Sequence, residues 1–201
     1  MSRALRIAVA DDELDMREYF QTILTRLGHE VVAVAGNGRE LLERCLESRP
    51  ELVITDIKMP DMDGIEAARQ IYRSGAVPVI LVSAYHEEAL IQRAEADHVM
   101  AYLVKPIKQA DLEPAIAIAM RRFEQFQALH QEASDLKQAL EDRKMIERAK
   151  GLLMKKASLD ENEAFRRLQR LASDRNKKLV EVAQMIVMAE EAFLPSERGK
   201  R

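Results

Sequence analysis

The segment LRIAVADDELDMREYFQTILTRLGHEVVAVA, residues Leu5 to Ala35, determines the architecture of the first half of the chain. It begins with the apolar run Leu5–Ala10, continues with apolar residues three or four positions apart, and ends with a second apolar run, Glu30–Ala35. Short apolar runs indicate strands, whereas a spacing of three or four indicates one face of a helix. The segment therefore predicts a strand, a helix and a second strand.

The same alternation repeats along residues 1–120. Three later apolar runs, Leu52–Thr55, Pro78–Ser83 and Val99–Val104, each precede a further helical pattern, and the first of these helices is expected from about Met62 to Ser74. The strands are apolar on both sides, which is typical of a parallel sheet covered by helices on both faces. Five such units predict an α/β domain with a doubly wound, five-stranded parallel sheet.

The chain after Asp111 contains no strand-like run. A helical pattern continues from Leu112 to about Ala157, and Pro114 fits its first turn, where a missing N–H does no harm. Two more helices follow. The first begins at Ser158–Glu161, which has the spacing of a capping box, and a turn at Asp174–Lys178 separates it from the second. We therefore expect a small three-helix bundle at the end of the chain.

The long helix carries apolar residues three and four positions apart. This spacing favours a short coiled coil, although it spans barely two heptads. A helix packed on its own domain would produce the same pattern, and both interpretations stay open. The residues are Phe126, Leu129, Ala133, Leu136 and Leu140.

Charge is distributed unevenly between the parts of the chain. The net charge is −3 overall, from about −7 in residues 1–120, −2 in 121–142 and +6 in 143–201. We divide the chain accordingly into a first domain, a helical linker over 121–142, a basic domain over 143–194 and a polar tail over 195–201. An acidic front and a basic rear suggest different partners, although drift in surface composition explains the same difference.

Composition excludes several classes of protein. Tryptophan is absent and aromatic residues make up only 4%, which argues against modules that stack bases on an aromatic sheet. The single cysteine, Cys45, forms no internal disulfide and suits a reducing compartment. The sequence shows neither a signal-peptide pattern nor an apolar run of membrane-spanning length. We expect a cytoplasmic protein without a membrane partner.

Polar residues with complementary chemistry follow the predicted strands. Asp11 and Asp12 follow the first strand, Asp56 the third and Lys105 the fifth, while Ser83 ends the fourth. Ligands bind at the carboxyl ends of parallel strands, so these residues are expected to meet. Clustered carboxylates suit Mg²⁺, and a carboxylate beside that ion and an ammonium group can accept a phosphoryl group. The alternatives are a helix cap, a turn residue and a surface charge.

These motifs, in this order, resemble the receiver domain of two-component response regulators over roughly residues 5–120. The resemblance implies a flavodoxin-like fold in which Asp56 is phosphorylated by a sensor histidine kinase. It also implies that Mg²⁺ is held by Asp12, Asp56 and the backbone carbonyl of Lys58, with Asp11 acting through water. The motifs are the acidic pair, D-x-K-M-P-x-M-D-G from Asp56 to Gly64, Ser83-Ala84 and Lys105-Pro106.

Two further roles follow from the same resemblance. Tyr102 matches an aromatic switch position, where the ring turns inward as Ser83 moves toward the phosphoryl group. The receiver is expected to catalyse only its own phosphorylation and its slow loss, so the chain is not expected to be a metabolic enzyme.

The rear of the chain, about Arg143–Ala192, resembles the ANTAR domain, an RNA-binding output of antitermination regulators. The resemblance lies in the ordered spacing of the pieces and not in any single residue. The matching pieces are Ala149-Lys150-Gly151 with Met154, Glu163-Ala164 with Leu168, Asn176-Lys177-Lys178-Leu179, and Val182-Ala183.

Basic residues cover this rear segment and form the candidate RNA surface. Gly151 belongs to this set because glycine costs about 1 kcal/mol in a helix interior, which requires a close approach by a neighbouring helix or an RNA backbone. A solvated charged face would show the same composition. The residues are Lys150, Gly151, Lys155, Lys156, Arg166, Arg167, Arg170, Arg175, Lys177 and Lys178.

The resemblance implies a homodimer that binds RNA hairpins in leader transcripts, prevents a terminator hairpin and lets transcription continue. We hypothesise that phosphorylated Asp56 favours this dimer by a population shift. Two alternatives are a DNA-binding transcription regulator and a protein-interaction adaptor. The rear segment has no clear pair of helices joined by a short glycine-containing turn, which disfavours a helix-turn-helix.

Overall fold

The computed structural model describes residues 3–84 and 99–193. The described residues form two compact units, divided between Gln127 and Ala128. One long helix, α5 (Gln109–Ala157), contributes residues to both units. Each unit is described separately below.

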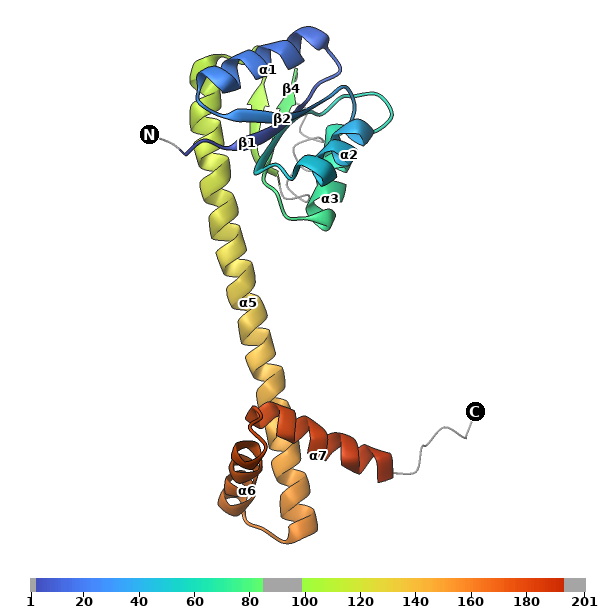
Figure 1. Cartoon of the computed structure of the whole chain (residues 1–201), viewed down its shortest axis with the longest axis vertical. Coiled ribbons are helices and arrows are strands. Elements are labelled where there is room, and N and C mark those ends of the chain that lie inside the picture. Colours follow the sequence, from blue (N-terminus) through green and yellow to red (C-terminus); the bar gives the residue numbers. More distant parts are fainter. Residues whose placement is uncertain (1–2, 85–98, 194–201) are drawn as a thin grey trace, which may run out of the picture. The chain divides into compact units, whose positions relative to one another are not determined.

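The first unit is built on a five-stranded sheet with the strand order β2-β1-β3-β4-β5, and every neighbouring pair of strands is parallel. The predicted doubly wound α/β fold is confirmed (Figure 1). The helix expected directly after Ser83 lies outside the described residues. The strands are β1 (Arg6–Ala10), β2 (Glu30–Ala35), β3 (Leu52–Asp56), β4 (Val79–Ser83) and β5 (Val99–Val104), and the helices before α5 are α1 (Leu14–Arg26), α2 (Gly38–Ser48) and α3 (Gly64–Ser74).

The sheet separates two hydrophobic cores. On one face, Ile7 and Val9 of β1 pack with Phe20 and Leu24 of α1 and with the start of α5. On the other face, residues of alternate parity in the same strands pack against α2 and α3 (Figure 1). Because both faces are covered, β3 and β4 are buried at every position, which explains their unbroken apolar sequences.

The loop from β3 to α3 brings two backbone segments into very close contact. Gly64 begins α3, and its backbone N–H donates to the carbonyl of Ile57 at 2.9 Å. A Cβ atom at Gly64 would lie 2.0 Å from the carbonyl oxygen of Asp56. Asp63 caps the helix by accepting a hydrogen bond from the Glu66 N–H at 2.7 Å. The Asp-Gly pair therefore allows α3 to start directly against the end of β3.

Helix α5 begins at Gln109, three residues before the predicted start at Leu112. Pro114 consequently lies in the second turn, so its expected place in the first turn is wrong. The missed signal is Asp111, whose carboxylate accepts a hydrogen bond from the Lys108 N–H at 3.0 Å and so stabilises the helix start. Pro114 is exposed in the second turn.

The second unit consists of the rear of α5, α6 (Glu161–Asp174) and α7 (Leu179–Phe193). The capping box of α6 is formed by Asp160 and Glu163 and not, as predicted, by Ser158 and Glu161. Ser158 has a φ of 52°, in the left-handed region, because the chain turns sharply there between two helices. The small core of this unit contains Ala149, Leu168, Ala172, Val182, Ala183 and Val187.

Three leucines in the middle of α5 are not covered by the residues that the structure describes. Leu129, Leu136 and Leu140 are 66%, 65% and 52% exposed. The interpretation that this segment packs on its own domain is therefore wrong for these three leucines, while a coiled coil with another chain stays a prediction. Within the described ranges, no helix combines the length and the apolar character needed to cross a membrane.

We expect Gly64→Ala to lower the free energy of unfolding by about 1–3 kcal/mol, because the added methyl group collides with the Asp56 carbonyl. Urea denaturation measures this change. Gly75→Ala is the control, since a Cβ there has nothing within 4 Å, and it should change stability by no more than about 0.5 kcal/mol. Equal effects at both positions would contradict the role of the close approach.

Candidate functional site

The carboxyl ends of β1 and β3 bring three carboxylates together. One ligand oxygen from each of Asp11, Asp12 and Asp56 lies within 4.8 Å of the others. Asp11 and Asp56 are buried, whereas Asp12 is exposed. The parallel strands cause this arrangement, because Asp11 directly follows β1 and Asp56 is the last residue of β3.

Lys105 completes the cluster from the end of β5. Its Nζ atom lies 2.8 Å from Oδ2 of Asp11 and 2.6 Å from Oδ2 of Asp56. The Lys105 backbone N–H also donates to the carbonyl of Ser83 at 2.9 Å, which continues the pairing of β4 with β5 up to the site. The structure thus brings together the strand ends that the sequence analysis selected.

A small cavity opens over this cluster. Ser83 is almost completely buried and faces the cavity from the end of β4. Glu13, which no sequence motif indicated, also lines the cavity, and its carboxylate lies 3.9 Å from the Lys105 ammonium. The lining residues are Asp12, Glu13, Asp56, Lys58, Ser83, Ala84 and Lys105.

Hydrogen bonds to the backbone carbonyls of Asp11 and Asp12 fix the position of the acidic pair. Nη1 of Arg17 donates to the carbonyls of Asp11 and Asp12 at 2.7 and 3.0 Å. The Glu13 N–H donates to Oδ1 of Asp11 at 3.0 Å, and Glu13 itself occupies the N-cap position of α1 without a capping side-chain bond. Neither aspartate therefore serves as the N-cap of α1. Arg17 was missed because nothing in its sequence position indicates that it reaches back to this loop.

Burial controls the electrostatics of the cluster. It raises the pKa of the Asp11 carboxyl, and the hydrogen bond and charge of Lys105 only partly counter this effect. For Lys105, burial acts to lower the pKa, but the hydrogen bonds to Asp11 and Asp56 outweigh it and the pKa is raised. The ammonium is therefore firmly protonated, while the ionised form of Asp11 is disfavoured.

The donor set fits a divalent cation. Oδ2 of Asp11 is fully buried and faces the Lys105 ammonium at 2.8 Å. Three carboxylates around a single ammonium leave net negative charge at an open edge of the sheet. Oxygen ligands of this kind suit Mg²⁺, which binds through few carboxylates and keeps several waters.

Of the two remaining predicted receiver residues, Lys58 lies at the cavity and Tyr102 lines a different pocket. Lys58 lines the cavity, and its backbone N–H donates to Oδ1 of Asp56 at 3.2 Å. Tyr102 lies on β5, is half-buried against the core on the α2–α3 face, and lines a separate pocket with Arg122. The role of its ring as a switch stays a prediction.

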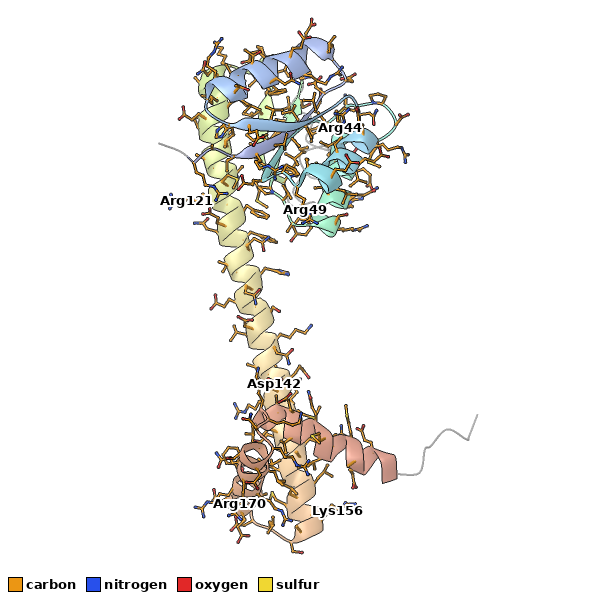
Figure 2. The ribbon with its side chains drawn as sticks, viewed as in Figure 1. Arg44, Arg49, Arg121, Asp142, Lys156 and Arg170 are labelled. Atoms are coloured by element: carbon orange, nitrogen blue, oxygen red, sulfur yellow. The ribbon has the colours of Figure 1, made fainter. Side chains whose placement is uncertain are left out.

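In the second unit, exposed cations gather on α6 and on the turn after it. Figure 2 shows the side chain of Arg170 directed away from the helices of this unit. The side chains of these residues make no ion pair with any other described residue. They are Arg166, Arg167, Arg170, Arg175, Lys177 and Lys178, together with Lys155 at the end of α5.

Lys150 differs from the surface cation that the sequence predicted. Its side chain is only 8% exposed, and Nζ lies 3.0 Å from Glu147 and 2.7 Å from Glu161. The hydrogen bonds to Glu161 and then Glu147 raise its pKa, and the ammonium also lies 5.9 Å from the centre of the Phe165 ring. Lys150 therefore joins α5 to the first turn of α6 and offers little charge to an external ligand.

Two further members of the predicted surface are also revised. Lys156 pairs with Glu190 of α7 at 2.6 Å, which reduces its free charge. Gly151 is exposed, and a Cβ there would meet nothing within 4 Å. The expected approach of a neighbouring helix to Gly151 is thus wrong for the described residues, and the need for glycine there has no explanation within the chain.

Comparisons with known proteins match both parts of the chain. Residues 7–117 match the family described as the response regulator receiver domain, and residues 134–187 match the ANTAR domain. The transcriptional regulatory protein PdtaR of Mycobacterium tuberculosis is 41% identical over 182 residues, covering 90% of this chain and 89% of that protein. The chemotaxis protein CheY of Thermotoga maritima is 33% identical, over 55% of this chain and 93% of its own.

Solved structures match the first unit. A response regulator receiver domain protein from Clostridium thermocellum has a TM-score of 0.56 at 29% identity, covering 62% of this chain and 99% of its own. A two-component response regulator of the LuxR family from Aurantimonas has a TM-score of 0.56 at 28% identity, covering 59% of this chain and 86% of its own.

We expect Asp11→Asn to raise the metal-free free energy of unfolding at neutral pH, as measured by urea denaturation. The folded-state pKa of Asp11 is raised, so its stabilising contribution is present below about pH 3.8 and is lost as the pH rises through the folded value. The same variant should lose much of the stabilisation by Mg²⁺, which for a site at 100 times Kd is about 2.7 kcal/mol.

Asp15→Asn is the control for this measurement, because Asp15 is exposed on α1 and lies outside the cluster. It should leave both quantities unchanged. A metal-free loss of stability in Asp11→Asn would contradict the conclusion that its ionised form is disfavoured.

Proposed function

The chain belongs to the response regulators that join a receiver domain to an ANTAR domain, and from this we propose a phosphorylation-controlled, RNA-binding regulator of transcription. The observation that carries the proposal is the meeting of Asp56, Lys105 and the acidic pair at one edge of the sheet. An exposed basic surface in the second unit supplies the matching output.

Asp56 is the phosphoryl acceptor in this proposal, and the donor is a phosphohistidine of a sensor histidine kinase. A carboxylate oxygen of Asp56 attacks phosphorus, the P–N bond breaks, and the electron pair leaves with the imidazole nitrogen. Asp12, Asp56 and the Lys58 carbonyl would hold Mg²⁺, and Asp11 would act on the ion through water. When bound, the ion neutralises charge on the transferred phosphoryl oxygens.

Lys105 and Ser83 respond to the new group. The ammonium of Lys105 already contacts Asp56 at 2.6 Å, so it is placed to pair with a phosphoryl oxygen on that side chain. Ser83 lines the same cavity and donates its hydroxyl hydrogen to another phosphoryl oxygen. Movement of Ser83 leaves space for the Tyr102 ring to turn inward, which changes the surface of the receiver.

The output is binding of RNA hairpins in leader transcripts, which prevents a terminator hairpin from forming. Arginine binds phosphates through a planar fork and stacks on unpaired bases, so α6 suits this role better than a lysine-rich surface would. Phosphorylated chains act as a homodimer that presents two such surfaces. Lys150 supports the surface from inside, because its ammonium ties α5 to the start of α6.

We expect phosphorylation to increase the affinity for tandem hairpin RNA by about 5–150-fold, the usual range of coupling between two sites. Asp56→Ala should show the lower affinity with or without a phosphoryl donor, because no acyl phosphate forms. Equilibrium binding by fluorescence anisotropy measures both. Glu43→Ala, an exposed change on α2, should behave like the unchanged chain. Tight binding by Asp56→Ala would overturn the coupling.

The salt dependence of RNA affinity separates exposed from buried cations. Replacing Arg166 and Arg170 with Gln should weaken binding and reduce the slope of log affinity against log salt by about 0.7–0.9 for each phosphate that the variant no longer neutralises. Lys150→Met should leave the slope unchanged, because this ammonium is already paired. A reduced slope for Lys150→Met would show that it contacts phosphate. Duplex DNA as competitor tests the DNA-binding alternative.

A further inference from the structure

Arg17 of α1 reaches back to the loop that carries the acidic pair. Its Nη1 atom donates to the carbonyls of Asp11 and Asp12 at 2.7 and 3.0 Å. Arg17 is the fourth residue of α1, and side chains in a helix point toward its start, so a long side chain at this position reaches the residues before the helix. Both bonds go to carbonyl oxygens, so the guanidinium does not occupy the carboxylate of Asp12.

The carboxylate of Asp12 depends on this support of its backbone. Asp12 is exposed, and its carboxylate accepts no hydrogen bond from any residue that the structure describes. The Asp11 carboxylate is fixed differently, by the Glu13 N–H at 3.0 Å and the Lys105 ammonium at 2.8 Å. Mg²⁺ requires close to octahedral geometry, with ligand oxygens at about 2.0–2.1 Å. The direction in which Asp12 enters the cluster is therefore set by the backbone that Arg17 holds.

The guanidinium of Arg17 also packs against the loop after β2. A Cβ atom on Gly36 would lie 3.4 Å from Nη1 of Arg17 and 3.7 Å from Oε2 of Glu40, so both groups lie next to this residue. Oε2 of Glu40 accepts a hydrogen bond from the Gly36 N–H at 2.7 Å. This bond, then Arg44 and the charge of Arg17, lower the pKa of Glu40. Arg17 and an ionised Glu40 thus fix the same loop.

The loop after β2 is joined in turn to the loops after β1 and β3. The Asp11 N–H donates to the carbonyl of Ala35 at 3.2 Å, and the Gly38 N–H donates to the carbonyl of Met62 at 3.1 Å. A Cβ atom on Gly38 would lie 2.5 Å from that Met62 oxygen, so these two loops are in close contact. Arg17 therefore belongs to a frame of three loops, although none of the three clustered carboxylates comes from β2.

We propose that Arg17 is a positioning residue of the receiver site, which presets the carboxylate of Asp12 for a divalent cation. This inference rests on the proposed function, because it takes the carboxylate cluster as a Mg²⁺ site. It adds to that site a residue that supplies no ligand atom. Partners of this outer kind orient the ligands of a metal, and their loss usually lowers metal affinity by about 10–100-fold.

The sign of the effect separates positioning from simple charge. Arg17 is a cation beside a site for a cation, so removal of its charge alone would strengthen the binding of Mg²⁺. Removal of a positioning group has the opposite effect, because Asp12 then has to be ordered when the ion binds. Weaker binding by a variant without the guanidinium is thus the result that only positioning explains.

The test is the affinity of the metal-free full chain for Mn²⁺, followed by the electron paramagnetic resonance signal of the free ion, with Mg²⁺ as competitor. Arg17→Met keeps most of the apolar stem but has no donor, and it should raise both dissociation constants about 10–100-fold. Arg17→Lys restores a donor and should return them to within about fivefold of the unchanged chain. Arg26→Met removes the same charge from the exposed last turn of α1 and should change them by less than about twofold. Unchanged or tighter binding by Arg17→Met would overturn the proposal.

A double-variant comparison excludes a general loss of structure. In a chain that already carries Asp12→Asn, Arg17→Met should weaken Mn²⁺ binding by no more than about threefold, because the carboxylate that it positions is gone. Full additivity of the two changes would show that Arg17 acts without Asp12 and would contradict the inference. Urea denaturation checks that each variant is folded. Arg17→Gln, whose amide is too short to reach both carbonyls, replaces Arg17→Met if that variant is not folded, and the same loss is expected.

Phosphorylation by acetyl phosphate separates this inference from the proposed function. A carboxylate oxygen of Asp56 attacks phosphorus, and acetate leaves with the electron pair of the broken P–O bond. Arg17→Met should need about 10–100-fold more Mg²⁺ for its half-maximal rate, while its maximal rate stays within about threefold of the unchanged chain. Metal affinity that depends on Arg17 in a chain that is never phosphorylated would support the inference and overturn the proposed function. Phosphorylation with the same Mg²⁺ requirement in both chains would support the proposed function and overturn the inference.

Discussion

The ammonium group of Lys105 is the interaction on which the receiver site depends. Two buried carboxylates, Asp11 and Asp56, could not share one edge of the sheet without a positive charge between them, since both lie within 3 Å of the same Nζ atom. A single ammonium does not neutralise three carboxylates, and the remaining charge makes the site receptive to a divalent cation. In the proposed function, the group that stabilises the resting site is also the one that would pair with a phosphoryl oxygen.

The second unit also contains a lysine that pairs with two carboxylates, but here the lysine is the buried group. Lys150 is buried while its partners Glu147 and Glu161 are 56% and 69% exposed, whereas Lys105 holds carboxylates that are almost fully buried. Exposed carboxylates can rehydrate at little cost, so the lysine is the group that depends on the pair. For Lys105 the buried acids depend on the lysine. The difference in burial therefore separates the two roles. Lys105 stabilises the buried carboxylates of a candidate cation site, whereas Lys150 joins two helices.

Much of the receiver site was predictable because topology dictates it. Once alternating strands and helices indicate a parallel sheet, residues at the carboxyl ends of its strands are expected to meet. The proximity of Asp56 and Lys105 follows from this rule alone. The partners of individual side chains could not be predicted. In the sequence, Lys150 looks like the basic residues around it, although in the structure it is buried and paired with two glutamates. The predicted starts of α5 and α6 were wrong for a related reason. Asp111 and Asp160 form hydrogen bonds at these helix starts, but the nearby Pro114 and Ser158 suggested other positions.

Helix α5 contributes to three environments in succession. Leu112 belongs to the core of the first unit and Ala149 to the core of the second, whereas the exposed residues Leu129, Leu136 and Leu140 between them belong to neither. The middle of α5 is therefore the part of this helix whose apolar side chains take no share in either core.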